Sequence, residues 1–236
     1  AEDSGKKQTS KKVTVRNDSD CAPWSNKNVI INIGEAGVNG EAQIQEHILF
    51  IRNVLNISYV RIWNLFSEKF MIAEDFRGDS FNFDYLDRIF DFFVQNKIPL
   101  FLDLSKRKRV IMASSRSELY SDMQQYTLAD IEEWKNLLDH FIVHLTRRYD
   151  RKLLEQWIFE FPWGKDPYYT ADYDYVTAYR EGREIIKRYL PNCRIAGICP
   201  NPNVNENQIR DVIHTLNEEK IFPEILTMKI FPDSSH

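Results

Sequence analysis

Six short apolar segments, separated by longer segments of helical periodicity, constrain the fold of this 236-residue chain more than any other feature. Each short segment has the length and the β-branched or apolar composition of a buried strand. Buried strands that alternate with helices indicate a parallel sheet covered by helices. The predicted strands are Val29–Ile33, Tyr59–Trp63, Leu100–Leu104, Gln156–Phe161, Arg194–Cys199 and Ile225–Phe231.

The segments between the strands carry apolar residues three, four or seven positions apart, which is typical of amphipathic helices. Two helices are predicted over residues 172–189 and 206–218, and each is followed by a proline that ends it, Pro191 or Pro223. Three earlier helices are marked by Ile44, Ile48, Ile51 and Leu55, by Phe83, Leu86, Phe90 and Phe93, and by Ile131, Leu138, Phe141 and Leu145.

A parallel sheet of this kind either stays open and doubly wound or closes into a barrel. The chain has only 8 glycines and no glycine-rich phosphate loop after any strand, which argues against a nucleotide-binding open sheet. Polar and aromatic residues stand at the strand ends instead, as on the rim of a barrel. We therefore predict an α/β fold, a TIM-type (β/α) barrel that is truncated after its sixth βα unit, near Phe231.

The domain boundaries follow from composition. Residues 1–12 are polar, charged and aperiodic, so we expect a flexible linker or arm there. Residues 13–236 then form one incomplete barrel domain with strands one to six. The basic segment that starts at Lys106 lies in a long loop, residues 105–127, which serves either as a lid or as a solvated turn.

Charge, cysteines and histidines exclude several classes of function. A net charge of −4 gives no basic surface for nucleic acid, so we expect no DNA contact by this segment. The 3 cysteines form no CxxC motif, and no signal peptide or membrane-spanning run is present, which favours a cytoplasmic protein. The only close histidines, His140 and His144, lack the glutamate of a zinc protease, so we expect no metal and no cofactor.

Four sequence segments together resemble glycoside hydrolase family 39, the β-xylosidase and iduronidase type. They are Ser58–Ser67, Phe81–Asp87, Pro99–Leu104 and Trp157–Glu160, and the resemblance extends over residues 29–232. More closely, Asn32–Ala36 together with Arg61–Asn64 is similar to the version of this domain in AraC-type transcription regulators of Gram-positive bacteria. That resemblance implies a saccharide-sensing barrel whose DNA contacts come only from a separate helix-turn-helix domain outside this chain.

The sequence departs from the family at its acid/base motif. Family enzymes end the fourth strand with Phe-Glu-x-Trp-Asn-Glu-Pro, whose second glutamate protonates the leaving oxygen. Here the strand continues Phe159-Glu160-Phe161-Pro162-Trp163-Gly164-Lys165, so glycine or, after a shift of one residue, lysine takes that place. The family's nucleophile comes from the seventh strand, beyond His236. We therefore expect a degenerate motif and no enzyme.

Two carboxylates are candidates for relocated catalytic groups. Side chains alternate along a strand, so Glu160 points to the same inner side as residue 164. It lies roughly 13 Å deeper, inside the barrel. Asp166 lies on a loop, where its neighbour Lys165 favours the ionised form over a proton-donating acid.

Residues at the carboxyl ends of the strands should converge on one pocket. Trp63 stands where the family tends to carry a histidine, and it either stacks on a sugar or fills the top of the barrel. We predict a non-catalytic, saccharide-sensing regulatory domain, with a β-xylosidase-type glycosidase or a structural, homodimer-forming domain as alternatives. The expected partner is a small saccharide, and no membrane association is expected. The expected ligand-binding residues are Glu35, Trp63, Asn64, Asp103, Glu160, Trp163 and Asn201.

Overall fold

The computed structural model describes residues 29–66, 70, 72, 80–104, 109–111, 125–127, 131–163, 175–200 and 204–228. Within them a parallel sheet of six strands runs in the order β1-β2-β3-β6-β7-β8. The strands are β1 (Val29–Glu35), β2 (Ile57–Trp63), β3 (Leu100–Asp103), β6 (Ile158–Glu160), β7 (Arg194–Ile198) and β8 (Ile225–Thr227). The helices are α1 (Ala42–Leu55), α2 (Asp84–Gln95), α3 (Ile131–Arg148), α4 (Arg151–Leu154), α5 (Tyr175–Tyr189) and α6 (Glu206–Glu218), with a 3-10 turn η1 at Val38–Gly40.

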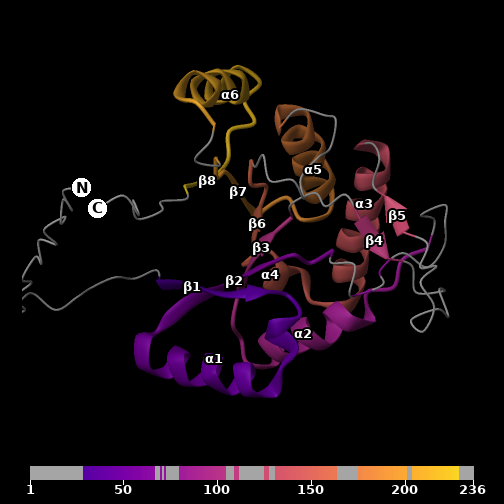
Figure 1. Ribbon diagram of the computed structural model, residues 1–236, viewed down its shortest axis with the longest axis vertical. Coiled ribbons are helices and arrows are strands. Elements are labelled where there is room, and N and C mark those ends of the chain that lie inside the picture. The colour runs from indigo at the N-terminus through magenta and orange to yellow at the C-terminus, as the bar shows by residue number, and fades with distance from the viewer. Residues whose placement is uncertain are drawn as a thin grey trace, which may run out of the picture.

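The strand order confirms the barrel prediction and excludes a doubly wound sheet. Each strand pairs with the next one along the sheet without the reversal that an open α/β sheet requires. The longer helices follow one another in an arc around the outside of the sheet (Figure 1). The described residues are therefore five βα units and a sixth strand of a TIM-type barrel, with β1 and β8 as the edge strands.

The alternation of side chains along β2 separates two hydrophobic layers. Val60 and Ile62 are fully buried in the large cluster between the sheet and the helices. Tyr59 points to the opposite side, where it packs with Phe101 and Ile158 in a small second cluster. Because neighbouring strands are in register, this second cluster is the bottom layer of the barrel interior.

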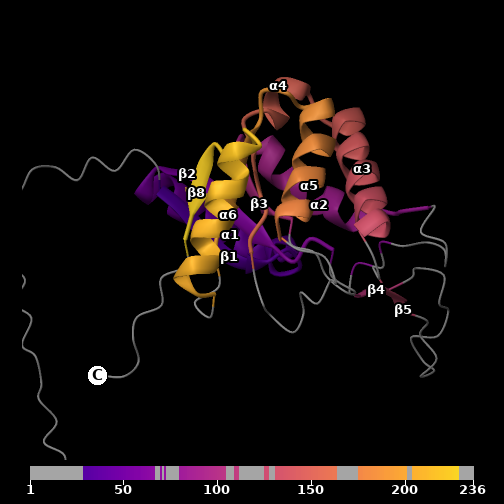
Figure 2. The same ribbon diagram turned by 90° about the horizontal axis from the view of Figure 1, so that it is seen from above.

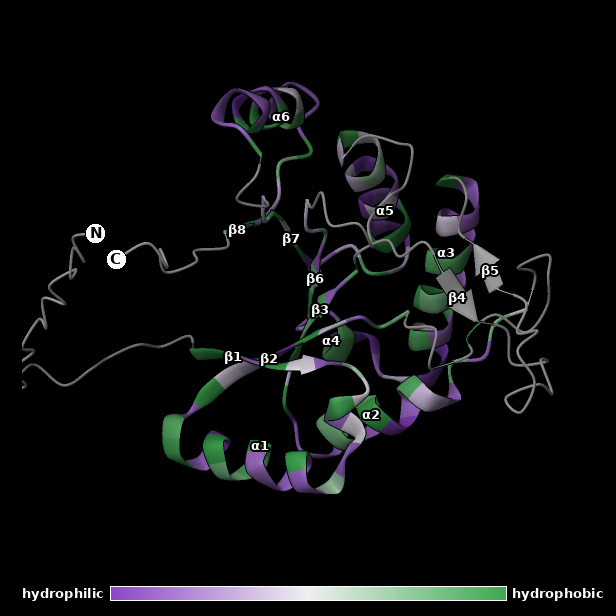
Figure 3. Ribbon diagram, in the orientation of Figure 1, coloured by the Kyte–Doolittle hydropathy of each residue, from purple (hydrophilic) through white to green (hydrophobic). Residues whose placement is uncertain are grey.

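The helical periodicity predicted the buried faces of α2 and α3 correctly, and in α1 it predicted Ile44, Ile48 and Ile51 correctly, whereas Leu55 differs. The predicted core residues Phe90 and Phe141 are fully buried, and Figure 3 shows α3 and α5 with both hydrophobic and hydrophilic residues along their length. In α1, Leu55 is 46% exposed and Phe50 is 68% exposed. The physical reason is position, since α1 covers the edge strand β1 and has neighbours on one side only.

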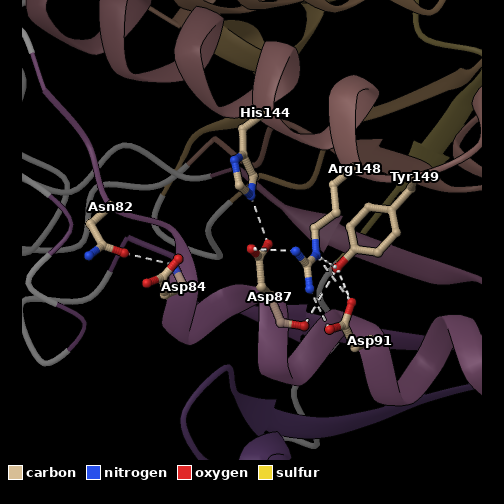
Figure 4. A network of polar contacts seen from close by, with 7 residues as sticks. All are labelled: Asn82, Asp84, Asp87, Asp91, His144, Arg148 and Tyr149. Atoms are coloured by element: carbon tan, nitrogen blue, oxygen red, sulfur yellow. Dashed lines mark hydrogen bonds and ion pairs between the residues drawn. The ribbon is translucent and has the colours of Figure 1, made fainter.

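A polar network joins α2 to α3 (Figure 4). His144 Nε2 lies 2.7 Å from Asp87 Oδ1, and Arg148 donates to Asp91 at 2.6 Å. The hydroxyl of Tyr149 donates to the same Asp91 at 2.8 Å. The two neighbouring histidines of α3 therefore have different partners. His144 contacts α2, whereas the ring of His140 is bonded to the α3 backbone at Asn136.

Gly182 lets α5 approach the sheet and α3 closely. A Cβ atom at this position would lie 2.5 Å from the ring of Phe161 and 2.7 Å from Trp134. A glycine at this point of α5 is therefore a packing requirement, although glycine is a poor helix former.

The long loop after β3 contains a two-stranded antiparallel hairpin, β4 (Arg109–Ile111) and β5 (Gln125–Thr127), which periodicity did not predict. The hairpin and the short helix α4 lie at opposite ends of the molecule (Figure 2). None of the helices within the described residues is long and apolar enough to span a membrane.

Candidate functional site

The predicted site residues stand at the carboxyl ends of neighbouring strands. Glu35 ends β1 and is paired in register with Trp63, which ends β2. Asp103 ends β3 and is paired with Glu160, which ends β6. The sheet thus places these four residues at the carboxyl ends of four neighbouring strands, with Glu35 and Trp63 at the rim, while Asn201 lies outside the described residues.

A polar pair links the ends of β1 and β2. Asn64 donates from Nδ2 to Glu35 Oε2 at 2.9 Å, and Asn64 has the left-handed backbone angle φ 60° that asparagine tolerates better than most residues. A register shift between Asn32 and Gly34, where Gly34 has φ 118°, turns Glu35 into place opposite Trp63. Glu35 and Asn64 remain partly exposed at the rim.

A buried ion cluster lies beneath this rim. Arg61 donates from Nε and Nη2 to Glu160 Oε2 at 2.9 and 2.5 Å, and from Nη2 to Asp103 Oδ2 at 2.8 Å. The side chains of Asp103 and Glu160 are only 3% and 2% exposed, and that of Arg61 is 16% exposed. The guanidinium also lies 6.0 Å from the centre of the Phe101 ring, directly above the apolar layer.

This ion cluster is a structural layer of the barrel interior. Burial lowers the pKa of Arg61, but the charges of Glu160 and Asp103 outweigh it and raise the pKa above the ordinary value. Arg61 therefore stays charged and holds both carboxylates. The prediction that Glu160 lies inside the barrel is confirmed, and Asp103 shares its depth, although both were also expected to line a ligand pocket.

An aromatic group forms the next part of the rim. The rings of Trp163 and Tyr175 are stacked, with centres 5.5 Å apart and an angle of 25° between their planes. The backbone N–H of Trp163 donates to Ile198 O at 2.7 Å, which extends the pairing of β6 and β7 beyond the strand ends. Trp163 is partly exposed, whereas Tyr175 is buried.

Sequence reasoning missed Arg61 and the role of Tyr175 in supporting Trp163. The signal for Arg61 was present, because it lies two residues before Trp63 and so shares its inward parity. The motif residues Gly164, Lys165 and Asp166 lie outside the described residues.

The described residues contain no group of three or more His, Cys, Asp or Glu side chains that could hold a metal ion. Cys193 and Cys199 are both buried thiols. Burial raises the pKa of the Cys193 thiol to about 11, which keeps it protonated and poorly nucleophilic at neutral pH.

The family model for glycosyl hydrolases family 39 matches residues 11–223, most of the chain. The chain belongs to glycosyl hydrolase family 39. It is 20% identical over 203 residues to a β-xylosidase of Geobacillus stearothermophilus, which covers 81% of this chain and 40% of that protein. It is 24% identical over 154 residues to a β-xylosidase of Caldicellulosiruptor saccharolyticus, which covers 62% of this chain and 31% of that protein.

A solved structure supports the same fold. The crystal structure of the family 39 enzyme from Xanthomonas axonopodis pv. citri superposes with a TM-score of 0.68 at 17% identity, over 85% of this chain and 40% of that one. The family 39 domain described here thus spans 40% or less of the length of these relatives.

The family assignment contradicts one expectation. The prediction that this chain is not an enzyme is wrong, because its relatives are β-xylosidases and family 39 enzymes, which point to glycosidase activity. The prediction depended on the short segment around Gly164 and on a nucleophile from a strand beyond His236, whereas the family match covers most of the chain. One short motif carried less information about function than a match over most of the chain.

Proposed function

We propose that the full protein is a glycosidase that acts on β-linked sugars of the β-xyloside type, and that this domain supplies the rim that binds the sugar. One observation carries the proposal. On a family 39 sheet, the partly exposed pair Glu35 and Asn64 stands beside Trp63, at the strand ends where such barrels bind their ligands. The β-xylosidase relatives support the reaction class.

The rim offers two kinds of contact to a sugar. Trp63 and Trp163 are partly exposed and present aromatic surface for the apolar face of a pyranose ring. Glu35 and Asn64 carry the acceptors and donors that fix hydroxyl groups. Arg61 and its two carboxylates hold the strand ends beneath them.

Hydrolysis with retention requires two carboxylates about 5 to 5.5 Å apart, one of which donates a proton. Asp103 and Glu160 are both bonded to the same guanidinium, and their buried carboxylate oxygens are engaged within that ion cluster. Glu35 is the partly exposed carboxylate among the described site residues, and Asp166 is the candidate given by the sequence. The candidates for the relocated catalytic group are therefore Glu35 and Asp166.

Turnover of p-nitrophenyl β-D-xyloside by the full-length protein tests this function. We expect hydrolysis by the wild type, and a loss of at least about a hundredfold for Glu35→Gln or for Asp166→Asn, the scale of one general acid or base. The matched control Glu206→Gln changes an exposed carboxylate on α6 and should leave turnover unchanged. Absence of turnover across a panel of aryl β-glycosides would contradict the proposal.

A second role, in transcription regulation, is supported by the similarity of Asn32–Ala36 and Arg61–Asn64 to the barrels of AraC-type regulators. In that case a sugar bound at the rim changes the DNA affinity of a separate helix-turn-helix domain. A gel-shift titration of the full-length protein with and without xylobiose distinguishes this role, because a glycosidase without it shows no sugar-dependent shift.

A further inference from the structure

Trp163 is held in place by two contacts, one to its backbone and one to its ring. Its backbone N–H is bonded to Ile198 O, and one side of its ring is covered by Tyr175. The hydroxyl of Tyr175 in turn donates to Phe161 O at 2.9 Å, two residues before Trp163 on the same segment. Tyr175 thus contacts both the ring of Trp163 and the backbone that leads to it.

The neighbouring strand β7 leaves the room that the hydroxyl of Tyr175 needs. A Cβ atom at Gly197 in β7 would lie 2.7 Å from the Tyr175 hydroxyl, so the glycine leaves the space that this hydroxyl occupies. Burial raises the pKa of Tyr175 well above its usual value, which keeps the hydroxyl protonated and able to donate to Phe161 O. Tyr175 is buried, so a ligand at the rim would meet Trp163 and not Tyr175.

We propose that Tyr175 is a positioning residue for the sugar site: it supports one face of Trp163 so that the exposed part of the indole forms a fixed stacking surface for a β-linked pyranose. This inference rests on the proposed function, and it adds a residue that has no direct contact with the sugar. A supported ring loses little conformational freedom on binding, which increases affinity without any additional contact.

The first measurement uses the full-length protein and thio-linked xylobiose, which is not hydrolysed, in calorimetric titrations. Tyr175→Leu removes the aromatic plane, and we expect affinity to fall about threefold to tenfold, the scale of one aromatic pair. Tyr175→Phe keeps the plane and should retain most of the affinity. In a Trp163→Ala background, Tyr175→Leu should cause no further loss, because the residue acts only through Trp163. An equal loss with and without Trp163 would overturn the proposal.

The second measurement needs no sugar and separates this inference from the proposed function. Acrylamide quenching of Trp163 is obtained from the difference between each protein and its Trp163→Phe counterpart. Replacing Tyr175 by leucine should increase the accessibility of Trp163, and replacing it by phenylalanine should not. Unchanged quenching in Tyr175→Leu overturns the positioning role even if the sugar binds. Increased quenching in a protein that binds no saccharide supports the positioning of Trp163 while contradicting the glycosidase proposal.

Discussion

Arg61 in β2 donates two hydrogen bonds to the same carboxylate oxygen of Glu160 in β6, at 2.9 and 2.5 Å, although the two residues are 99 positions apart in the sequence. The same guanidinium reaches Asp103 on the strand between them. Three consecutive strands of the sheet are thereby joined directly below the rim. A layer of charged side chains therefore lies directly beneath the rim, and its geometry depends on Arg61.

Replacing Arg61 by methionine is expected to destabilise the protein by about 3–5 kcal/mol, because it leaves two neighbouring carboxylates buried without their cation. Urea denaturation of the full-length protein measures the effect. The double variant Arg61→Met with Glu160→Gln should recover part of the loss, since one buried charge is then removed. A change of less than about 1 kcal/mol in the single variant would contradict the structural role of the cluster.

Gly182→Ala is expected to destabilise the protein by about 1–3 kcal/mol, the usual cost of overpacking, because the new methyl group would collide with Phe161 and Trp134. The better helix propensity of alanine offsets less than about 1 kcal/mol of this. Gly37→Ala is the matched control, because its Cβ would meet Phe70 at an ordinary 3.7 Å. Thermal unfolding of both variants checks the prediction, and equal melting temperatures would show that the α5 contact is not as tight as described.

Glu224 should make stability depend on pH in the acid range. Burial raises its pKa, but hydrogen bonds from Lys187 and from the Ile195 backbone N–H outweigh this and lower the pKa below the usual value. Because the folded pKa is depressed, the stabilisation is complete above the unfolded value of about 4.3 and is lost as the pH falls through the folded value. The wild type should exceed Glu224→Gln in stability at pH 6, and the difference should shrink below about pH 4. Denaturation curves that stay equally far apart at both pH values would rule this out.

The sequence predicted the fold because strands and helices leave local, periodic signals. All six strands and the buried faces of α2 and α3 follow from runs and spacings of apolar residues. The exposure of Leu55 did not follow, because it depends on how many neighbours α1 has in the sheet. The hairpin β4–β5 depends on backbone pairing between two distant parts of a long loop, and such pairing leaves no periodic pattern of apolar residues.

The site was predictable only in part, for a related reason. Alternation along each strand placed Glu35, Trp63 and Glu160 on the inner side of the barrel, and the structure has them at the carboxyl ends of β1, β2 and β6. The ion cluster around Arg61 depends on the register of three strands, which a single sequence does not encode locally. Likewise, the stacking of Tyr175 on Trp163 depends on how α5 packs against the end of β6, which no local pattern in the sequence reports.

The most direct test of the account is calorimetric titration of the full-length protein with thio-linked xylobiose, comparing Trp63→Ala with Phe50→Ala. Both variants remove a large aromatic side chain, but Trp63 ends β2 at the rim, whereas Phe50 is exposed on the outer helix α1. We expect saturable binding by the wild type, a loss of about tenfold or more in Trp63→Ala, and no change in Phe50→Ala. Binding that is absent from the wild type, or that is equal in all three proteins, would contradict a sugar site at the rim.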